Sequence, residues 1–281
     1  MKNYKISHKT KLFDFSLREI YLYKSLIYHL VKRDFISLYK QTVLGPLWYI
    51  IKPILASIVF TIFFGNFAGI PTDGIPKFIF YFSGTVIWGY FTMVLSKTCS
   101  VFVSNSALFS KVYFPRIILP ISQALVSYLQ FFIQLMVFIG FYLYFNIYLQ
   151  TDNLNPNILF IILVLPINFI MLGIFSVGLG ILSSALTTKY RDIIHVLEFS
   201  IQLFMFFTTV VYSFNSLSPY MQIVMSFNPI SIIIEIFRFS FFGSSSLQVI
   251  HILISLSVTF FVLIFGFLLF NKVQHKAIDV I

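Results

Sequence analysis

The sequence predicts an all-α integral membrane protein with six transmembrane helices. Of its 281 residues, 59% are hydrophobic and only 10% are charged, and the mean hydropathy is +0.93. Soluble domains contain roughly 45–50% apolar residues, so this excess indicates a chain that lies mostly in lipid. Backbone groups in lipid must pair within helices or a closed barrel, and the long, continuous apolar runs favour helices.

Six stretches are apolar enough to span a bilayer, which takes about twenty residues. They are Trp48–Phe67, Phe78–Val103, Ile117–Leu149, Ile158–Leu186, Ile194–Phe214 and Leu247–Phe270. We therefore divide the chain into a cytoplasmic N-terminal segment with an interfacial helix (residues 1–46), a six-helix membrane domain (47–270) and a short cytoplasmic tail (271–281).

Basic residues predict the orientation. The chain has 19 Lys and Arg against 9 Asp and Glu, a net charge of +10. These cations gather before the first span, in the loops after the second and fourth spans, and in the tail. Such loops usually face the cytoplasm, which places both termini there. The positive charge therefore reflects topology, and we expect no nucleic-acid partner.

The pattern before the first span predicts an amphipathic helix that lies in the membrane interface. Ser16-Leu17-Arg18-Glu19 is typical of a capping box, and Gly45-Pro46 ends the helix and turns the chain into the membrane. Apolar residues recur on one face and basic residues occupy the other, as in helices on a bilayer surface. The helix is either a general anchor to anionic lipid or a functional element.

Two cytoplasmic loops have the composition of contact sites. In the first, Ser104 or Ser106 can cap a short helix that Pro115 must end. This helix would present apolar side chains to a partner protein or to lipid headgroups; they are Leu108, Phe109, Val112, Tyr113 and Phe114. The second loop has three residues that either pair with a partner or end the span, namely Tyr190, Arg191 and Asp192.

Before the last span, residues 214–243 are too interrupted for a single span. Ser218-Pro219 and Asn228-Pro229 are both typical of helix starts, so we expect two short re-entrant helices on the extracytoplasmic side. Glu235 and Arg238 lie three residues apart and can pair on one helix face. Ionisable residues at membrane depth are candidates for function, and a structural ion pair is the alternative.

Motifs of catalysis and cofactor binding are missing from the sequence. There is no H-E-x-x-H, G-x-S-x-G or G-x-x-x-x-G-K-[ST] pattern, and the five histidines are widely dispersed. We expect no catalytic residue, no metal and no cofactor in this chain. The single cysteine, Cys99, excludes an intrachain disulfide.

Four stretches, in this order, resemble one family: the membrane subunits of ABC exporters for polysaccharides such as O-antigen, capsular polysaccharide and teichoic acid. They read "RDFISLYKQTVLGPLW", "SNSALFSKVYFPRIILP", "KYRDI" and "FNPISIIIEIFRFSFFG". The resemblance covers almost the whole chain. It implies a homodimeric permease in the bacterial cytoplasmic membrane, bound to two cytoplasmic ABC ATPase subunits that hold ATP and Mg. Together these subunits would export a lipid-linked glycan.

The resemblance also implies roles for individual residues. The two cytoplasmic loops would couple to the ATPase through Ser106, Leu108, Phe109, Lys111, Tyr113, Phe114, Arg116, Tyr190, Arg191 and Asp192. The interfacial helix would frame the point where substrate enters, through Arg33, Asp34, Tyr39 and Lys40. The outer helices would form an extracytoplasmic gate that includes Pro219, Asn228, Pro229, Glu235 and Arg238. The short tail departs from a pattern with a glycan-recognition domain, so recognition of a glycan end-cap would reside elsewhere.

Aromatic residues make up 20% of the chain and favour a surface for sugars, because sugar faces pack well on flat rings. We predict that aromatics facing a dimer axis line a channel for the glycan; these are Tyr81, Trp88, Tyr128, Phe131 and Phe207. For each of them, contact with lipid is the alternative.

Two other functions stay open. One is an ABC exporter of a small hydrophobic molecule or lipid, which would share the architecture. The other is a membrane-embedded transferase, which would need intramembrane His, Asp or Glu at a catalytic spacing that we do not find.

Overall fold

The protein is a bundle of helices. The computed structural model describes residues 17–40, 44–45, 47–105, 108, 114–147, 156–190, 192–243 and 246–274, without the side chains of residues 17–19, 38, 39, 273 and 274. Within these ranges every regular element is helical: α1 (Leu17–Leu22), α2 (Lys24–Lys40), α3 (Leu47–Phe60), η1 (Thr61–Phe67), α4 (Lys77–Cys99), α5 (Val101–Ser104), α7 (Ile118–Ile147), η2 (Phe160–Val164), α8 (Leu165–Thr187), α9 (Ile193–Phe204), η3 (Met205–Phe207), η4 (Phe214–Ser216), α10 (Pro219–Ser226), α11 (Pro229–Phe242) and α12 (Val249–Gln274).

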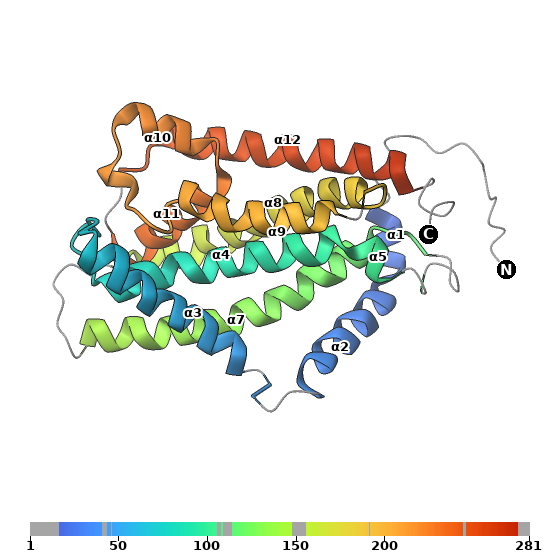
Figure 1. The fold of residues 1–281 in the computed structure, drawn as a ribbon, viewed down its shortest axis with the longest axis horizontal. Helices are drawn as coiled ribbons and strands as arrows, with labels where there is room; N and C mark the ends of the chain where they lie inside the picture. The colour runs from blue at the N-terminus through green and yellow to red at the C-terminus, as the bar shows by residue number, and fades with distance from the viewer. Residues whose placement is uncertain are drawn as a thin grey trace.

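Helix α4 is the centre of the bundle. Its apolar stretch is 78% buried, and it packs against α3, α7, α8, α9 and α11 (Figure 1). A helix that is apolar all round is stable only where neighbours or lipid cover every face. The span formed by α3 and η1 is by contrast only 11% buried, and that of α12 only 17%. Most residues of these outer helices are therefore half-buried or exposed in the protomer.

The bundle has two distinct ends. Helices α1 and α5 and the C-terminal end of α12 lie at one end, which we call the α5 end (Figure 1). Helix α10 and the end of η1 lie at the other, which we call the α10 end (Figure 1). The long helices α4, α7, α8 and α12 run between these ends (Figure 1).

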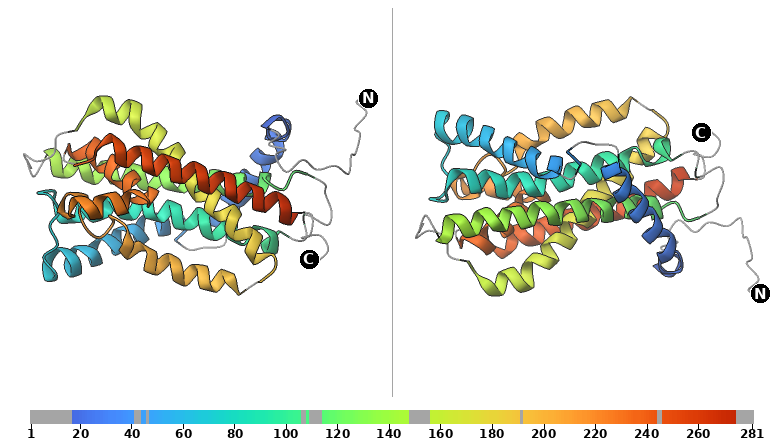
Figure 2. Two further views of the ribbon diagram at one scale, coloured as in Figure 1. Left: turned by 90° about the horizontal axis from the view of Figure 1, so that it is seen from above. Right: turned by 90° about the horizontal axis from the view of Figure 1, so that it is seen from below.

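Helix α2 crosses the bundle at the α5 end (Figure 2). Its amphipathic pattern is confirmed, since Lys32 and Arg33 are exposed while Ile27 and Leu30 are buried. For an interfacial helix we expect the apolar face to contact lipid. Ile27 and Leu30 do not do so. Both residues pack into a cluster with Phe102 and other apolar side chains of the bundle. Tertiary packing therefore covers the inner part of the apolar face of α2.

Five of the six predicted spans are confirmed as helices long and apolar enough to cross a membrane. The prediction of a span at Ile194–Phe214 is wrong in extent. Helices α9 and η3 end at Phe207, and Thr208 is extended with φ −129° and ψ 159°. At 1.5 Å per residue, the residues from Ile193 to Phe207 cover about 22 Å, less than the roughly 30 Å of a hydrocarbon core.

The two predicted helix starts before the last span are confirmed. The Ser218 side chain accepts a hydrogen bond from the Met221 amide, and the Asn228 side chain accepts one from the Ile230 amide. In both helices a proline occupies the first turn, where its missing N–H costs nothing. Helices α10 and α11 meet at an angle of 110°, so they form either a re-entrant hairpin or one broken span.

Helices α8 and α12 touch through their backbones. A Cβ atom placed on Gly266 would lie 2.6 Å from the Gly178 carbonyl oxygen, and one on Gly178 would lie 3.1 Å from the Leu263 Cα atom. Small residues at such crossings let membrane helices approach closely and gain van der Waals contact. The pairing of α12 with the bundle therefore depends on these two glycines.

We expect Gly266→Ala to destabilise the protein by about 1–3 kcal/mol, because the added methyl group would clash with the Gly178 carbonyl of α8. Backbone cannot move aside as a flexible side chain can. Thermal unfolding in detergent measures the effect. Gly140→Ala on α7 is the matched control, since nothing lies within 4 Å of its Cβ position. Equal melting temperatures for the two variants would show that the α8–α12 crossing tolerates separation.

Candidate functional site

A buried arginine joins three segments near the α10 end. Arg238 on α11 is 1% exposed and forms an ion pair of 2.9 Å with Glu235, one turn earlier, which is 2% exposed. The predicted pairing of these two residues is confirmed. An ion pair this deep is stable only if its remaining donors also find partners.

The Arg238 guanidinium meets that condition through α4 and the segment after α9. Its Nε donates to Ser83 Oγ at 3.1 Å, and one Nη donates to the carbonyls of Phe80 at 3.2 Å and Val210 at 3.5 Å. The other Nη donates to the Thr209 carbonyl at 2.6 Å, beside its bond to Glu235. The cation also lies 3.6 Å above the centre of the Phe80 ring, a favourable cation–π distance. We call Arg238 and these partners the arginine hub.

The arginine hub explains why α9 stops early. The carbonyls of Thr209 and Val210 follow an extended residue and have no helical partner, which would be costly inside a membrane. Arg238 donates to both of them. The span predicted from the sequence continued past Phe207 because residues 208–213 are apolar or weakly polar and their partner lies on another helix.

Helix α4 leaves room for this contact at Gly84. A Cβ atom there would lie 3.0 Å from the Val210 Cα atom and 3.3 Å from an Arg238 nitrogen. Any larger residue would push the segment after α9 away from α4, and the carbonyls with it. The role of Gly84 could not be predicted from the local sequence, because it depends on a contact with residues far along the chain.

A polar network ties the loops together beyond the arginine hub. Asp73 has a left-handed backbone conformation, with φ 53°. Its carboxylate accepts hydrogen bonds from the Ser213 hydroxyl and, at 2.8 Å, from the side-chain NH2 group of Asn215. The Asn215 side chain in turn accepts from the Ser246 amide at 2.6 Å. Gln222 on α10 donates to the Ser246 hydroxyl at 3.2 Å. The loop before α4, the loop after α9 and helix α10 are therefore connected at the α10 end.

Four of the five aromatics predicted to line a channel lie inside the protomer. Tyr81 is fully buried, Phe131 and Trp88 are 1% and 8% exposed, and the half-buried Tyr128 donates its hydroxyl proton to the Phe169 carbonyl. These side chains fill the contacts around α4, so the lining role predicted for them is corrected to one in packing. Phe207 alone is open, at 64% exposure.

Several exposed phenylalanines belong to η1, α9 and η3. The span of α3 and η1 and the helix α9 flank α4 on one side of the bundle (Figure 2). The rings of Phe64 on η1 and Phe206 on η3 lie 6.3 Å apart and connect the two elements. We call this surface the α3–α9 face. Its exposed phenylalanines are Phe63, Phe67, Phe199, Phe204, Phe206 and Phe207.

At the α5 end, one of the predicted substrate-entry residues of the interfacial helix, Asp34, contacts the bundle. The Asp34 carboxylate pairs with Arg33 at 2.7 Å and accepts a hydrogen bond of 2.7 Å from Gln123 on α7. This contact fastens α2 to the bundle. Lys40 is exposed at the C-terminal end of α2, whereas the Tyr39 side chain lies outside the described residues.

The first of the two loops predicted to couple to an ATPase is described only in part. Ser106, Phe109, Lys111 and Tyr113 lie outside the described residues, and Leu108 and Arg116 are half-buried. Phe114 is 7% exposed and packs against the cluster that also holds Ile27 and Leu30. The prediction that Phe114 is presented to a partner is therefore wrong, because α2 and the bundle cover it.

The second loop predicted to couple to an ATPase is more open. Tyr190 is 52% exposed, and Lys189 lies 4.9 Å above its ring. A hydrogen bond with Tyr190, together with the electrostatic interaction between the two side chains, raises the pKa of Lys189. Asp192 is exposed immediately before α9, while Arg191 lies outside the described residues.

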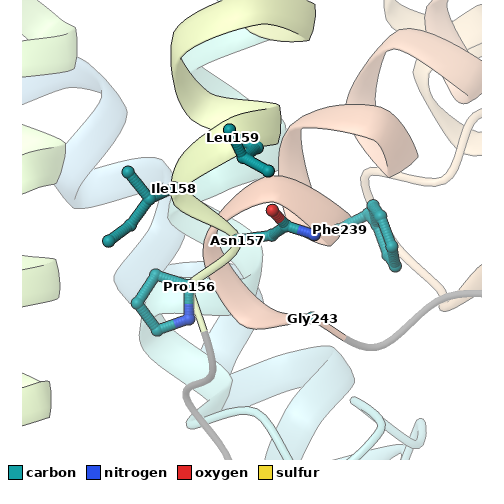
Figure 3. Close-up of a pocket in the computed structure, with 6 residues that line it drawn as sticks. All are labelled: Pro156, Asn157, Ile158, Leu159, Phe239 and Gly243. Atoms are coloured by element: carbon teal, nitrogen blue, oxygen red, sulfur yellow. The ribbon is translucent and has the colours of Figure 1, made fainter.

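A shallow pocket of about 440 Å³ lies where α11 meets the start of the η2–α8 span (Figure 3). Pro156, Asn157, Phe239 and Gly243 are among its lining residues. The Asn157 amide already donates to the Ser240 carbonyl, and its side chain already accepts from the Phe160 amide. These bonds connect the two helices at their junction. In the described part of the chain, no group of three His, Cys, Asp or Glu could hold a metal ion.

Apolar helices around a buried central helix, with cations at one end and a bent helix pair at the other, define a multi-pass membrane protein of the permease class. The chain belongs to the ABC-2 type transporter family, whose model matches residues 25–242, well over half of the chain. Membership makes it the membrane component of a transporter rather than an enzyme, and implies an ABC ATPase as partner.

Relatives with assigned names extend the similarity over the full fold. The chain is 24% identical to the O-antigen export system permease protein RfbA of Klebsiella pneumoniae, over 93% of this chain and 96% of that protein. It is 26% identical to the protein of the same name from Myxococcus xanthus, over 72% of this chain and 73% of that protein. The family model, which spans residues 25–242, includes both predicted coupling loops and the bent helix pair.

We expect Arg238→Met to destabilise the protein by about 3–5 kcal/mol, because it leaves Glu235 buried without its partner. Arg238→Lys should fall between this variant and the wild type, since one ammonium group cannot reach all the carbonyls that the guanidinium reaches. Thermal unfolding in detergent measures both. A Lys variant as stable as the wild type would show that charge alone, without the planar set of donors, holds the hub.

Proposed function

We propose that this chain is the permease subunit of an ATP-driven ABC transporter that exports a lipid-linked polysaccharide across the bacterial inner membrane. The observation that carries this proposal is the similarity to named O-antigen export permeases over 93% of the chain and 96% of the relative. Similarity over the whole length, rather than over one motif, favours a shared cargo class as well as a shared fold.

We assign the α5 end to the cytoplasm. The exposed cations of the described chain concentrate there, on α2, on Lys189 and on Lys272, and such a bias is typical of the cytoplasmic side. Both termini and both coupling loops would then face the ATPase subunits, which hold ATP and Mg. Closure of the ATPase pair around ATP would push on these loops, because ATP binds the closed state better.

We assign the α3–α9 face to the contact between two copies of the chain. The span of α3 and η1 is only 11% buried in one protomer, so a second copy has ample apolar surface to cover. The exposed phenylalanines of η1, α9 and η3 would meet their counterparts across the axis. Their flat rings suit the faces of passing sugars, which replaces the buried aromatics of the sequence prediction.

We assign the bent pair α10–α11 to an extracytoplasmic gate. The arginine hub connects α11 to the end of α9, and the network of Asp73 and Asn215 connects the surrounding loops. A displacement of α9 on the dimer axis would therefore reach α11 through Arg238. Pro219, Asn228 and Pro229 would set the bend of the gate by starting its two helices.

Deleting the gene tests the cargo. We expect the deletion strain to lose surface glycan and to accumulate lipid-linked polymer inside the cell, because synthesis continues while export stops. Immunoblotting of surface glycan and extraction of the lipid-linked fraction measure the two effects. The wild-type chain should restore both. Unchanged surface glycan would instead favour a small hydrophobic molecule or lipid as cargo.

A further inference from the structure

A glutamine without hydrogen-bond partners lies in the middle of the bundle. Gln130 on α7 is 0% exposed, and neither its Oε1 nor its Nε2 atom bonds another atom of the described chain. It lies about 18 Å of helix from Ile118, where α7 begins, so its short side chain cannot reach the α5 end. An unpaired amide in a dry interior costs free energy, and lipid supplies no partner for it. Such a group in a native protein indicates a bound ligand or water.

Gln130 belongs to a polar stripe on α7, whose members share one helix face because they lie three or four residues apart. They are Gln123, Ser127, Gln130 and Gln134. Helix α4 and the residue after it carry a second stripe of glycine and hydroxyl residues at the same kind of spacing, all half-buried. They are Gly89, Thr92, Ser96 and Ser100. Membrane helices turn such faces toward the protein interior or toward water.

The two stripes face each other where α4 packs against α7. A Cβ atom on Gly89 would lie 3.6 Å from Gln134 Oε1, and the Phe82 and Phe141 rings lie 5.7 Å apart toward the α10 end. Phe82 precedes Gly89 by as many residues as Phe141 follows Gln134, so the helices are antiparallel and keep one register. Continued toward the α5 end, this register brings the serines of the α4 stripe level with the other polar residues of the α7 stripe. We call the contact between the stripes the polar seam.

Helix α3 packs beside the polar seam. Ser57 Oγ and Thr85 Oγ1 lie 2.8 Å apart and align α3 with α4 in antiparallel fashion, and α3 also packs against α7. Tyr49 lies about two turns from Ser57 toward the α5 end, which is the level of Gln130 in the α4–α7 register. Pro53 inside α3 has no N–H, so it cannot give the Tyr49 carbonyl its helical hydrogen bond. A carbonyl without its helical donor and an unpaired amide therefore lie at one level on neighbouring helices.

Charged groups lie where the polar seam meets the α5 end. Gln123 donates a hydrogen bond of 2.7 Å to Asp34 on α2, which also pairs with Arg33. Asp34 attracts the ammonium group of Lys97 as well, a half-buried residue that follows Ser96 on α4. Charged side chains keep water near them, because removing it is costly. The polar seam therefore leads from a hydrated region to Gln130.

We propose that water enters the polar seam from the α5 end and binds between Gln130 and the Tyr49 carbonyl. A buried water forms about three hydrogen bonds, so one molecule can accept from the amide and donate to the carbonyl. Space is present beside Gly89, where Gln134 Oε1 is the one described atom of another helix within 4 Å of the Cβ position. The Gln130 amide itself is closed off, so α3 must move slightly before water reaches it. Little packing opposes this, because the span of α3 and η1 is only 11% buried.

The water site makes the first part of α3 a movable wall. Ser57 bonds α4 directly, whereas near Tyr49 the helix would contact the bundle through water. Pro53 lies between these two points, and proline is where a helix bends most easily. The part of α3 nearest the α5 end can therefore separate from α7 while the rest stays in place. This inference goes beyond the proposed function, since it holds for any cargo.

Cysteine accessibility tests whether the polar seam is wet. In a Cys99→Ala background, we expect Thr92→Cys in membrane vesicles to react with a charged, water-soluble thiol reagent about tenfold faster than Leu129→Cys, because lipid suppresses the reactive thiolate. Leu129 on α7 is the matched control. It is 40% exposed whereas Thr92 is half-buried, and the register places it about 3 Å nearer the α5 end. Exposure and depth alone would thus make Leu129→Cys the faster variant, and equal rates or that order would overturn the proposal.

A second substitution tests the role of Gln130. We expect Gln130→Met to slow the labelling of Thr92→Cys several-fold, because methionine has a similar length but cannot hold water in the seam. Gln202→Met, on an exposed position of α9, should leave the rate unchanged. Thermal unfolding in detergent shows whether each variant is folded. An unchanged rate in Gln130→Met would overturn the binding of water at Gln130, and a higher melting temperature would then show that the native amide has no partner.

Discussion

The Arg238 guanidinium group donates hydrogen bonds to the backbone carbonyls that follow α9, and these bonds determine the arrangement of the α10 end. A membrane offers no water to satisfy backbone groups, so a chain can leave helical geometry only where the protein supplies donors. Arg238 supplies several in a fixed plane, and Glu235 balances the charge. With those donors in place, α9 can stop short, the chain can turn, and α11 can lie against α4. An apolar side chain at this position could pack, but it could not satisfy the carbonyls.

Local sequence signals predicted those features that depend on neighbouring residues. Ser218-Pro219 and Asn228-Pro229 mark helix starts because cap and proline act within one turn, and both starts are where the sequence places them. The long spans were equally clear, since lipid requires continuous apolar runs. The amphipathic pattern of α2 was also predictable from spacing alone.

Features that depend on contacts between distant residues were not predictable in this way. The end of α9 depends on a donor from Arg238, and the burial of Phe114 depends on α2 packing beside it. Aromatic composition could not separate Tyr81, which fills the bundle, from Phe207, which lies open, because both are apolar rings in apolar helices. Which face of a membrane helix points into the protein is decided by packing, because lipid and the protein interior are similarly apolar.

Helix α12 contacts the bundle chiefly through α8, and the crossing is made by backbone atoms at Gly178 and Gly266. Leu182 lies beside Gly266 and Val262 beside Gly178, so side chains pack closely around this backbone contact. Because few residues of α12 are buried in the protomer, a change in bilayer thickness would act on the tilt of this helix. Such a change in tilt would be passed on through α8, which also packs against the central helix α4.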